Sequence, residues 1–119
     1  MNTIKLALLS LSLASTVSLA GECTAPAKPT VPDGGTASME DMLAGQKSVK
    51  GFQTANLAYM ACLEPQIAAA RAELEAGDKG AADRITQLEE TYNDAVSQEE
   101  EVADHFNTEI RDYKAANAK

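Results

Sequence analysis

The feature that most constrains this chain is an amphipathic pattern that starts at Ser38 and runs to Leu63. Ser38 and Asp41 have the spacing of a capping pair, in which a hydroxyl and a carboxylate satisfy amides at a helix start. The following residues recur at alternating steps of three and four, which predicts a helix burying one face. Its predicted seam is Met39, Met42, Gln46, Val49, Gln53, Asn56, Met60 and Leu63. The three amides predict polar positions satisfied across a helix pair, and a ligand-binding role is the alternative.

Pro65 interrupts this pattern, because a proline lacks an amide and clashes with the preceding turn. It therefore either kinks one helix or begins a new one. The three-four pattern continues in phase through Ile67, Ala70 and Leu74, which favours one kinked helix. Gly77 has the place of a left-handed terminator, so a tight connection is expected over 77–80.

A second long helix is predicted over 81–116. Its stripe is Ile85, Leu88, Tyr92, Ala95, Val96, Val102, Ala103, Phe106, Ile110 and Tyr113. The aromatic residues of this stripe have heptad spacing, as in a coiled coil. Two long helices joined by a short loop form an antiparallel hairpin. We therefore expect an all-α domain over 38–119, with Phe52 beside Phe106.

The first twenty residues have the character of a signal peptide. Lys5 precedes an apolar run, over 6–13, that is too short to span a bilayer, and small residues stand before a cleavage site after Ala20. The sequence therefore predicts an exported protein, periplasmic or secreted, with no membrane insertion after cleavage. Leu19-Ala20-Gly21 followed directly by a cysteine would be a lipoprotein signal, but Glu22 intervenes before Cys23, which disfavours a lipid-modified cysteine.

Residues 21–37 form a proline-rich arm. Pro26, Pro29 and Pro32 are spaced three apart, which favours an extended polyproline-like segment. In an exported chain, two cysteines predict a disulfide between Cys23 and Cys62, with an intermolecular pairing as the alternative.

The length of the arm lets it fold back along the first helix. We expect it to pack over the side that carries Phe52, Ala55 and Tyr59. A bare two-helix hairpin buries little per residue, so either this arm or a homodimeric four-helix bundle must supply further burial.

The negative net charge of the chain limits the classes of molecule that it can bind. The formal net charge is −8, which disfavours nucleic acid and anionic membrane surfaces. No Lys or Arg stands between Arg84 and Arg111, and the carboxylates there are Glu89, Glu90, Asp94, Glu99, Glu100, Glu101, Asp104 and Glu109. The run has two interpretations, a solvated helix face or a surface for cations and basic partners at Glu99, Glu100, Glu101 and Asp104.

Within this run, Glu101, His105 and Glu109 are four residues apart and share one face of a helix. Two carboxylates and an imidazole are ligands that Zn²⁺ accepts, so the three form a candidate metal site. The alternative is a surface histidine flanked by acids. No familiar nucleophile, phosphate-loop or metalloprotease motif occurs, so we expect no catalysis and no cofactor.

Several short segments carry a family resemblance. They are Val49-Lys50-Gly51-Phe52, Tyr59-Met60-Ala61-Cys62-Leu63, Tyr92-Asn93-Asp94-Ala95-Val96, Val102-Ala103-Asp104-His105-Phe106-Asn107 and Ile110-Arg111-Asp112-Tyr113-Lys114. With the proline-rich arm, they resemble a family of small, uncharacterised exported proteins of proteobacteria. The resemblance implies a periplasmic or secreted helical protein with paired cysteines, and it carries over no catalytic residues.

These observations predict a non-catalytic exported protein that acts as a structural or partner-binding module. The partner is either an unknown protein or a second copy of the chain. The alternative is a periplasmic binding or chaperone-like protein whose acidic helix face holds metal cations or basic clients.

Overall fold

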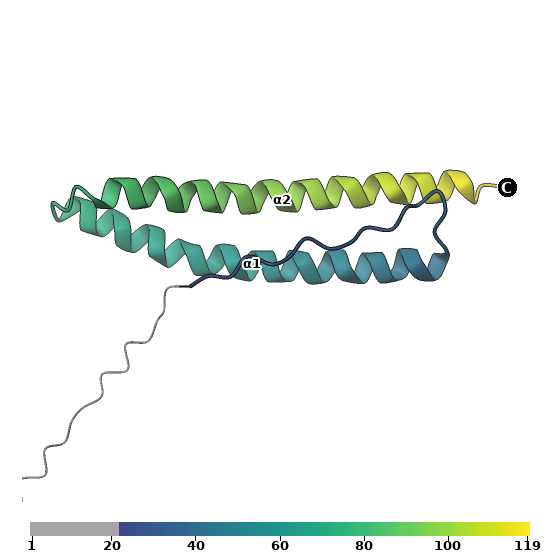
Figure 1. The fold of residues 1–119 in the computed structure, drawn as a ribbon, viewed down its shortest axis with the longest axis horizontal. Coiled ribbons are helices and arrows are strands. Elements are labelled where there is room, and N and C mark those ends of the chain that lie inside the picture. Colours follow the sequence, from purple (N-terminus) through teal and green to yellow (C-terminus); the bar gives the residue numbers. More distant parts are fainter. Residues whose placement is uncertain (1–21) are drawn as a thin grey trace, which may run out of the picture.

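The protein is a helical hairpin, seen here in a computed structural model that describes residues 22–119. Helix α1 spans Met39–Glu75, helix α2 spans Ala81–Ala116, and the described residues contain no strand. The two helices run antiparallel along their whole length, with the arm returning between them (Figure 1). The predicted all-α hairpin is therefore confirmed. The predicted signal peptide, residues 1–20, lies outside the described residues.

Helix α1 begins at the predicted cap. The Ser38 hydroxyl accepts from the Asp41 amide at 3.1 Å, and an Asp41 carboxylate oxygen accepts from the Ser38 amide at 3.2 Å. The hydrogen bond with the Ser38 side chain, followed by that with its backbone, lowers the pKa of Asp41 below its ordinary value of 3.8. This reciprocal capping box satisfies two amides at the start of the helix.

Pro65 lies inside α1, which continues to Glu75, so the prediction of one continuous helix is confirmed. Figure 1 shows that α1 changes direction along its length, whereas α2 is nearly straight. A proline within a helix is a sufficient cause for such a bend, because it removes one helical hydrogen bond and crowds the turn before it.

The hairpin turn follows directly from the end of α1. Gly77 has φ +102°, a conformation that side chains with a Cβ rarely adopt. The Asp78 amide donates to the Glu73 carbonyl at 3.0 Å and the Gly77 amide to the Leu74 carbonyl at 3.1 Å. These are the two bonds of a Schellman motif, and the predicted terminator at Gly77 is confirmed.

The core lies between the helices toward their open end. The buried cluster comprises Met42, Val49, Phe52, Val102 and Phe106, with Val31, Ala37, Ile110 and Tyr113 packed against it. Phe52 and Phe106 belong to one cluster, as predicted.

The predicted seam of α1 is wrong at three positions. Met39 is 57% exposed, Gln46 is exposed, and Leu74 is 39% exposed. Burial instead extends to Gly45 and Phe52, on the flank that the arm also covers. Gly45 is buried because Pro32 of the arm packs over it, and a two-helix pattern does not include this contact.

Asn56 is the one buried polar side chain among the described residues, at 2% exposure. Its Nδ2 donates to the Ala95 carbonyl of α2 at 2.9 Å. The amide is therefore satisfied across the helix pair, as predicted, and this contact fixes the level at which the two helices meet.

The arm lies in the groove between the helices and contacts both of them. Lys28 Nζ forms an ion pair with Glu101 Oε2 at 2.9 Å, and the Gly34 amide donates to Glu109 Oε2 at 2.7 Å. A Cβ on Gly45 would lie 2.6 Å from Pro32 Cδ, so this glycine permits the close approach of the arm.

The N-terminal end of the arm is joined to α1 by the predicted disulfide. Cys23 and Cys62 are bonded, with their Cα atoms 5.7 Å apart. The expected docking side is correct at Tyr59, which shares a hollow with Pro26, but wrong at Ala55, which is exposed. The arm misses Ala55 because it follows the groove, where it buries surface against two helices rather than one.

The capping box predicts a pH-dependent stability. Because Asp41 has a lowered pKa in the folded state, its contribution is complete above 3.8 and is lost as the pH falls through the folded-state pKa. We expect Ser38→Ala to lower the free energy of unfolding at neutral pH by about 1 kcal/mol. The stability advantage of the wild type over Asp41→Asn should disappear in acid, as measured by urea unfolding at pH 6 and pH 2. Glu40→Gln, in the same turn but outside the box, is the control. A pH-independent advantage would contradict this account.

The turn of the arm predicts opposite effects for two glycine substitutions. A Cβ on Gly34 would lie 1.8 Å from the Glu109 carbonyl oxygen, and backbone cannot move aside as a flexible side chain does. We expect Gly34→Ala to destabilise the protein by about 2 kcal/mol. Gly51 lies in α1 with nothing near it, so Gly51→Ala should stabilise by about 0.5–1 kcal/mol. Urea unfolding of both variants tests the arm contact, and a neutral Gly34→Ala would be evidence against it.

Candidate functional site

The arm covers one side of the groove and leaves the other side of the hairpin open. On the covered side, arm residues line hollows together with Ala44, Gly45 and Ser48 of α1. The open side, called here the uncovered face, carries the apolar residues Met39, Leu43, Leu57, Val96 and Ile110. Leu43 and Leu57 are fourteen residues apart, as are Val96 and Ile110, and fourteen residues are close to four helical turns. Each pair therefore lies on one side of its helix.

Large apolar side chains are exposed on the uncovered face. Met39 and Leu43 are each 57% exposed, Leu57 is 58% exposed and Val96 is 37% exposed. Within residues 22–119, only Leu74 is a further large apolar side chain of this kind. Single exposed apolar residues need no explanation, whereas these four share one face and form an apolar stripe along the hairpin.

An apolar groove lies at the open end of this face. It has a volume of about 370 Å³ and is lined by the start of α1 and the end of α2. Its lining residues are Met39, Met42, Leu43, Gln46, Phe106, Ile110, Tyr113 and Lys114. Only one charged side chain is among them, so the groove suits an apolar side chain of a partner.

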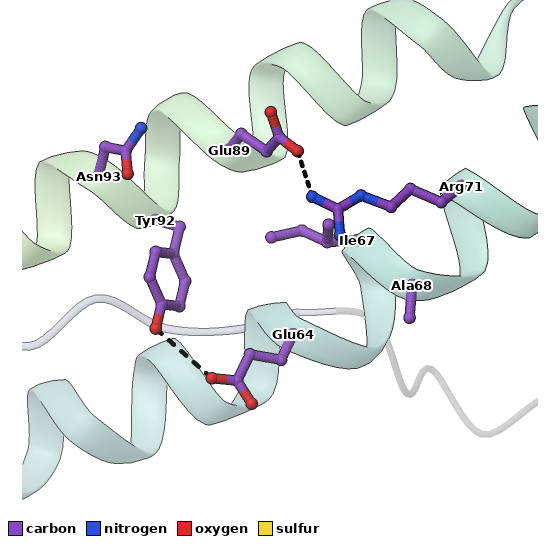
Figure 2. A pocket seen from close by; sticks show the side chains of 7 residues that line it. All are labelled: Glu64, Ile67, Ala68, Arg71, Glu89, Tyr92 and Asn93. Atoms are coloured by element: carbon purple, nitrogen blue, oxygen red, sulfur yellow. Dashed lines mark hydrogen bonds and ion pairs between the residues drawn. The ribbon is translucent and has the colours of Figure 1, made fainter.

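A second hollow lies near the bend of α1 and is shown in Figure 2. This cleft has a volume of about 460 Å³. It is lined by Glu64, Ile67, Ala68 and Arg71 of α1 and by Glu89, Tyr92 and Asn93 of α2. Arg71 follows Leu57 by fourteen residues, close to four helical turns, and Tyr92 precedes Ile110 by eighteen residues, or five turns, so the cleft opens on the uncovered face.

Two contacts between the helices frame the cleft (Figure 2). Arg71 Nη2 lies 2.6 Å from Glu89 Oε1, and the Tyr92 hydroxyl donates to Glu64 Oε1 at 3.4 Å. The charged groups are therefore paired at the rim, while Ile67 is buried at its floor. This arrangement offers an apolar floor, an aromatic wall and a polar rim, which fits the side chain of a binding partner.

The predicted acidic surface is not one face. Residues two apart on a helix point about 200° away from each other, so Glu99 and Glu101 lie on different sides of α2. Glu101 is turned to the arm and pairs with Lys28, whereas Glu100 and Asp104 are exposed and Glu99 is half-buried. The four residues are thus split between the arm side and other parts of the helix surface.

The three predicted metal ligands do not form one cluster. His105 Nε2 is 3.7 Å from Glu109 Oε1, while Glu101 pairs with Lys28 and Glu109 also accepts from the Gly34 amide. Within the described part of the chain, no three His, Cys, Asp or Glu side chains form a group that could hold a metal ion. The structure therefore does not support the predicted three-ligand metal site, because Glu101 and Glu109 contact the arm instead.

The disulfide joins the arm to α1 on the covered side of the hairpin. Cys62 is exposed, Cys23 is half-buried, and Gln66 Nε2 lies 3.2 Å from Cys23 Sγ. The bridge therefore positions the arm, and it lies outside the two hollows of the uncovered face.

Sequence reasoning missed the uncovered face. Leu43 and Leu57 fall outside the three-four seam of α1, so the core pattern does not include them. The signal was present in the fourteen-residue spacing of Leu43 with Leu57 and of Val96 with Ile110. Two apolar pairs of equal spacing on two facing helices indicate a second stripe.

Between residues 22 and 119, neither helix combines the length and the apolar character needed to cross a membrane. Comparisons of the chain with protein-family models, curated proteins and solved structures found no match.

Proposed function

We propose that this chain is an exported, non-catalytic helical module that binds a partner protein through its uncovered face. The observation that carries the proposal is the exposure of Met39, Leu43, Leu57 and Val96 on one side of the hairpin. Exposed apolar area of this kind is unfavourable in water and is retained where a partner covers it.

The two hollows support binding to a protein rather than to a small solute. Each is shallow and lies along the helices, so side chains of an apposed helix could enter both at once. From Leu43, in the groove, to Arg71, in the cleft, α1 rises by about 42 Å, a span that suits an extended surface. An amphipathic helix that lays its apolar face into an apolar groove is a recurring mode of recognition.

Export is supported by the first twenty residues and by the disulfide. A charged start, a short apolar run and small residues before a cleavage site are the features of a signal peptide. Disulfides persist in oxidising compartments and are rare in the cytosol, so the Cys23–Cys62 bridge fits an exported protein.

Site-specific photo-crosslinking in living cells tests the binding face. A photoreactive residue at position 57 lies on the uncovered face, and one at position 58, turned about 100° around the helix, is the matched control. We expect a discrete adduct from position 57 and none from position 58, in a protein recovered from the exported fraction. No adduct from position 57, or equal adducts from both, would count against the proposal.

A further inference from the structure

Charge on the uncovered face differs between the two helices. On α1 this face carries Lys50, Glu64 and Arg71, and on α2 it carries Glu89, Glu99 and Lys114. Arg71 and Glu89 pair within the chain, whereas Lys50 and Glu99 have no ion pair in the described residues. Lys50 is exposed and Glu99 is half-buried, so near its middle the face presents a cation on α1 and a carboxylate on α2.

This pattern is self-complementary. We propose that the partner on the uncovered face is a second copy of this chain, related by a two-fold axis parallel to the long axis of the hairpin. The assembly is a four-helix bundle in which the two arms lie on the outside. The inference rests on the proposed function, because it names the occupant of the same face.

The symmetry decides which residues meet. A two-fold axis has no translation along itself, so α1 of one copy lies over α2 of the other at the same level. The Asn56–Ala95 contact places Leu57 and Val96 within about one turn of each other along the hairpin. Leu57 therefore packs against Val96 of the partner subunit. Lys50 likewise lies within a turn of Glu99 of the partner subunit.

Every neighbouring helix pair in this bundle is antiparallel. The alternative face-to-face arrangement sets α1 on α1 and α2 on α2. That arrangement would bring the α2 side of one face against the α2 side of the other, and near the middle of α2 this side carries the carboxylates Glu89 and Glu99. Repulsion between like charges disfavours it and selects the first arrangement.

The face is large enough for a stable dimer. From Met39 to Arg71 it is about 48 Å long at the helical rise, and two helices side by side are about 20 Å wide. The resulting footprint, on the order of 900 Å² per copy, compares with about 800 Å² per partner in a standard interface.

Charge reversal with rescue tests this arrangement. Lys50→Glu and Glu99→Lys each oppose like charges twice in a symmetric dimer, so each should weaken dimerisation by roughly tenfold or more. An equimolar mixture restores both contacts, because the Lys50→Glu chain offers two carboxylates and the Glu99→Lys chain offers two cations. We expect a heterodimer with near wild-type affinity, measured by native mass spectrometry and sedimentation equilibrium.

Two variants with the same change in net charge are the controls. Lys79→Glu lies in the connection between the helices, and Asp104→Lys lies on the exposed outer side of α2. Neither should change dimerisation, alone or mixed. A monomeric wild type at high concentration, a Lys50→Glu chain that dimerises as the wild type does, or a mixture without rescue would each overturn the inference.

The crosslink at position 57 separates this inference from the proposed function. An adduct with twice the mass of the mature chain supports a second copy. An adduct with a different protein overturns the inference and leaves the proposed function standing. The absence of any adduct from position 57 counts against both.

Discussion

The disulfide between Cys23 and Cys62 is the constraint on which the rest of the structure depends. The arm has no helix or strand of its own, and beyond the bridge it is held mainly by an exposed ion pair, one amide at Gly34 and apolar contacts of Val31 and Pro32. Contacts of this kind are individually weak. Closing the chain between the cysteines keeps the arm near the groove and thereby makes these contacts effective.

The arm makes the two sides of the hairpin different. It covers the flank of α1 that carries Gly45, and it contacts α2 through Glu101 and Glu109. The opposite side receives no such cover and retains Leu43 and Leu57 in water. Binding to a partner, and to a second copy in particular, would provide on this side the burial that the arm provides on the other.

Sequence reasoning could predict the elements of this fold because local chemistry specifies them. The Ser38 cap, the glycine at 77 and the unbroken phase through Pro65 each act within a few residues. The burial of Gly45 depends on an arm distant in sequence, so a helical pattern could not indicate it. The prediction of one acidic face was wrong for a related reason. Residues adjacent in sequence lie about 100° apart on a helix, so a dense run of charged residues is distributed around the helix.

Urea unfolding of the oxidised and the reduced protein tests the central claim most directly. The Cys23–Cys62 bridge has a sequence separation of 39, and closing such a loop restricts the unfolded chain by about 4 kcal/mol. Cys62 is exposed, so a reductant can reach it. The account predicts that reduction lowers the free energy of unfolding by about this amount and releases the arm from the groove. Equal stability with and without reductant would contradict the role given to the bridge.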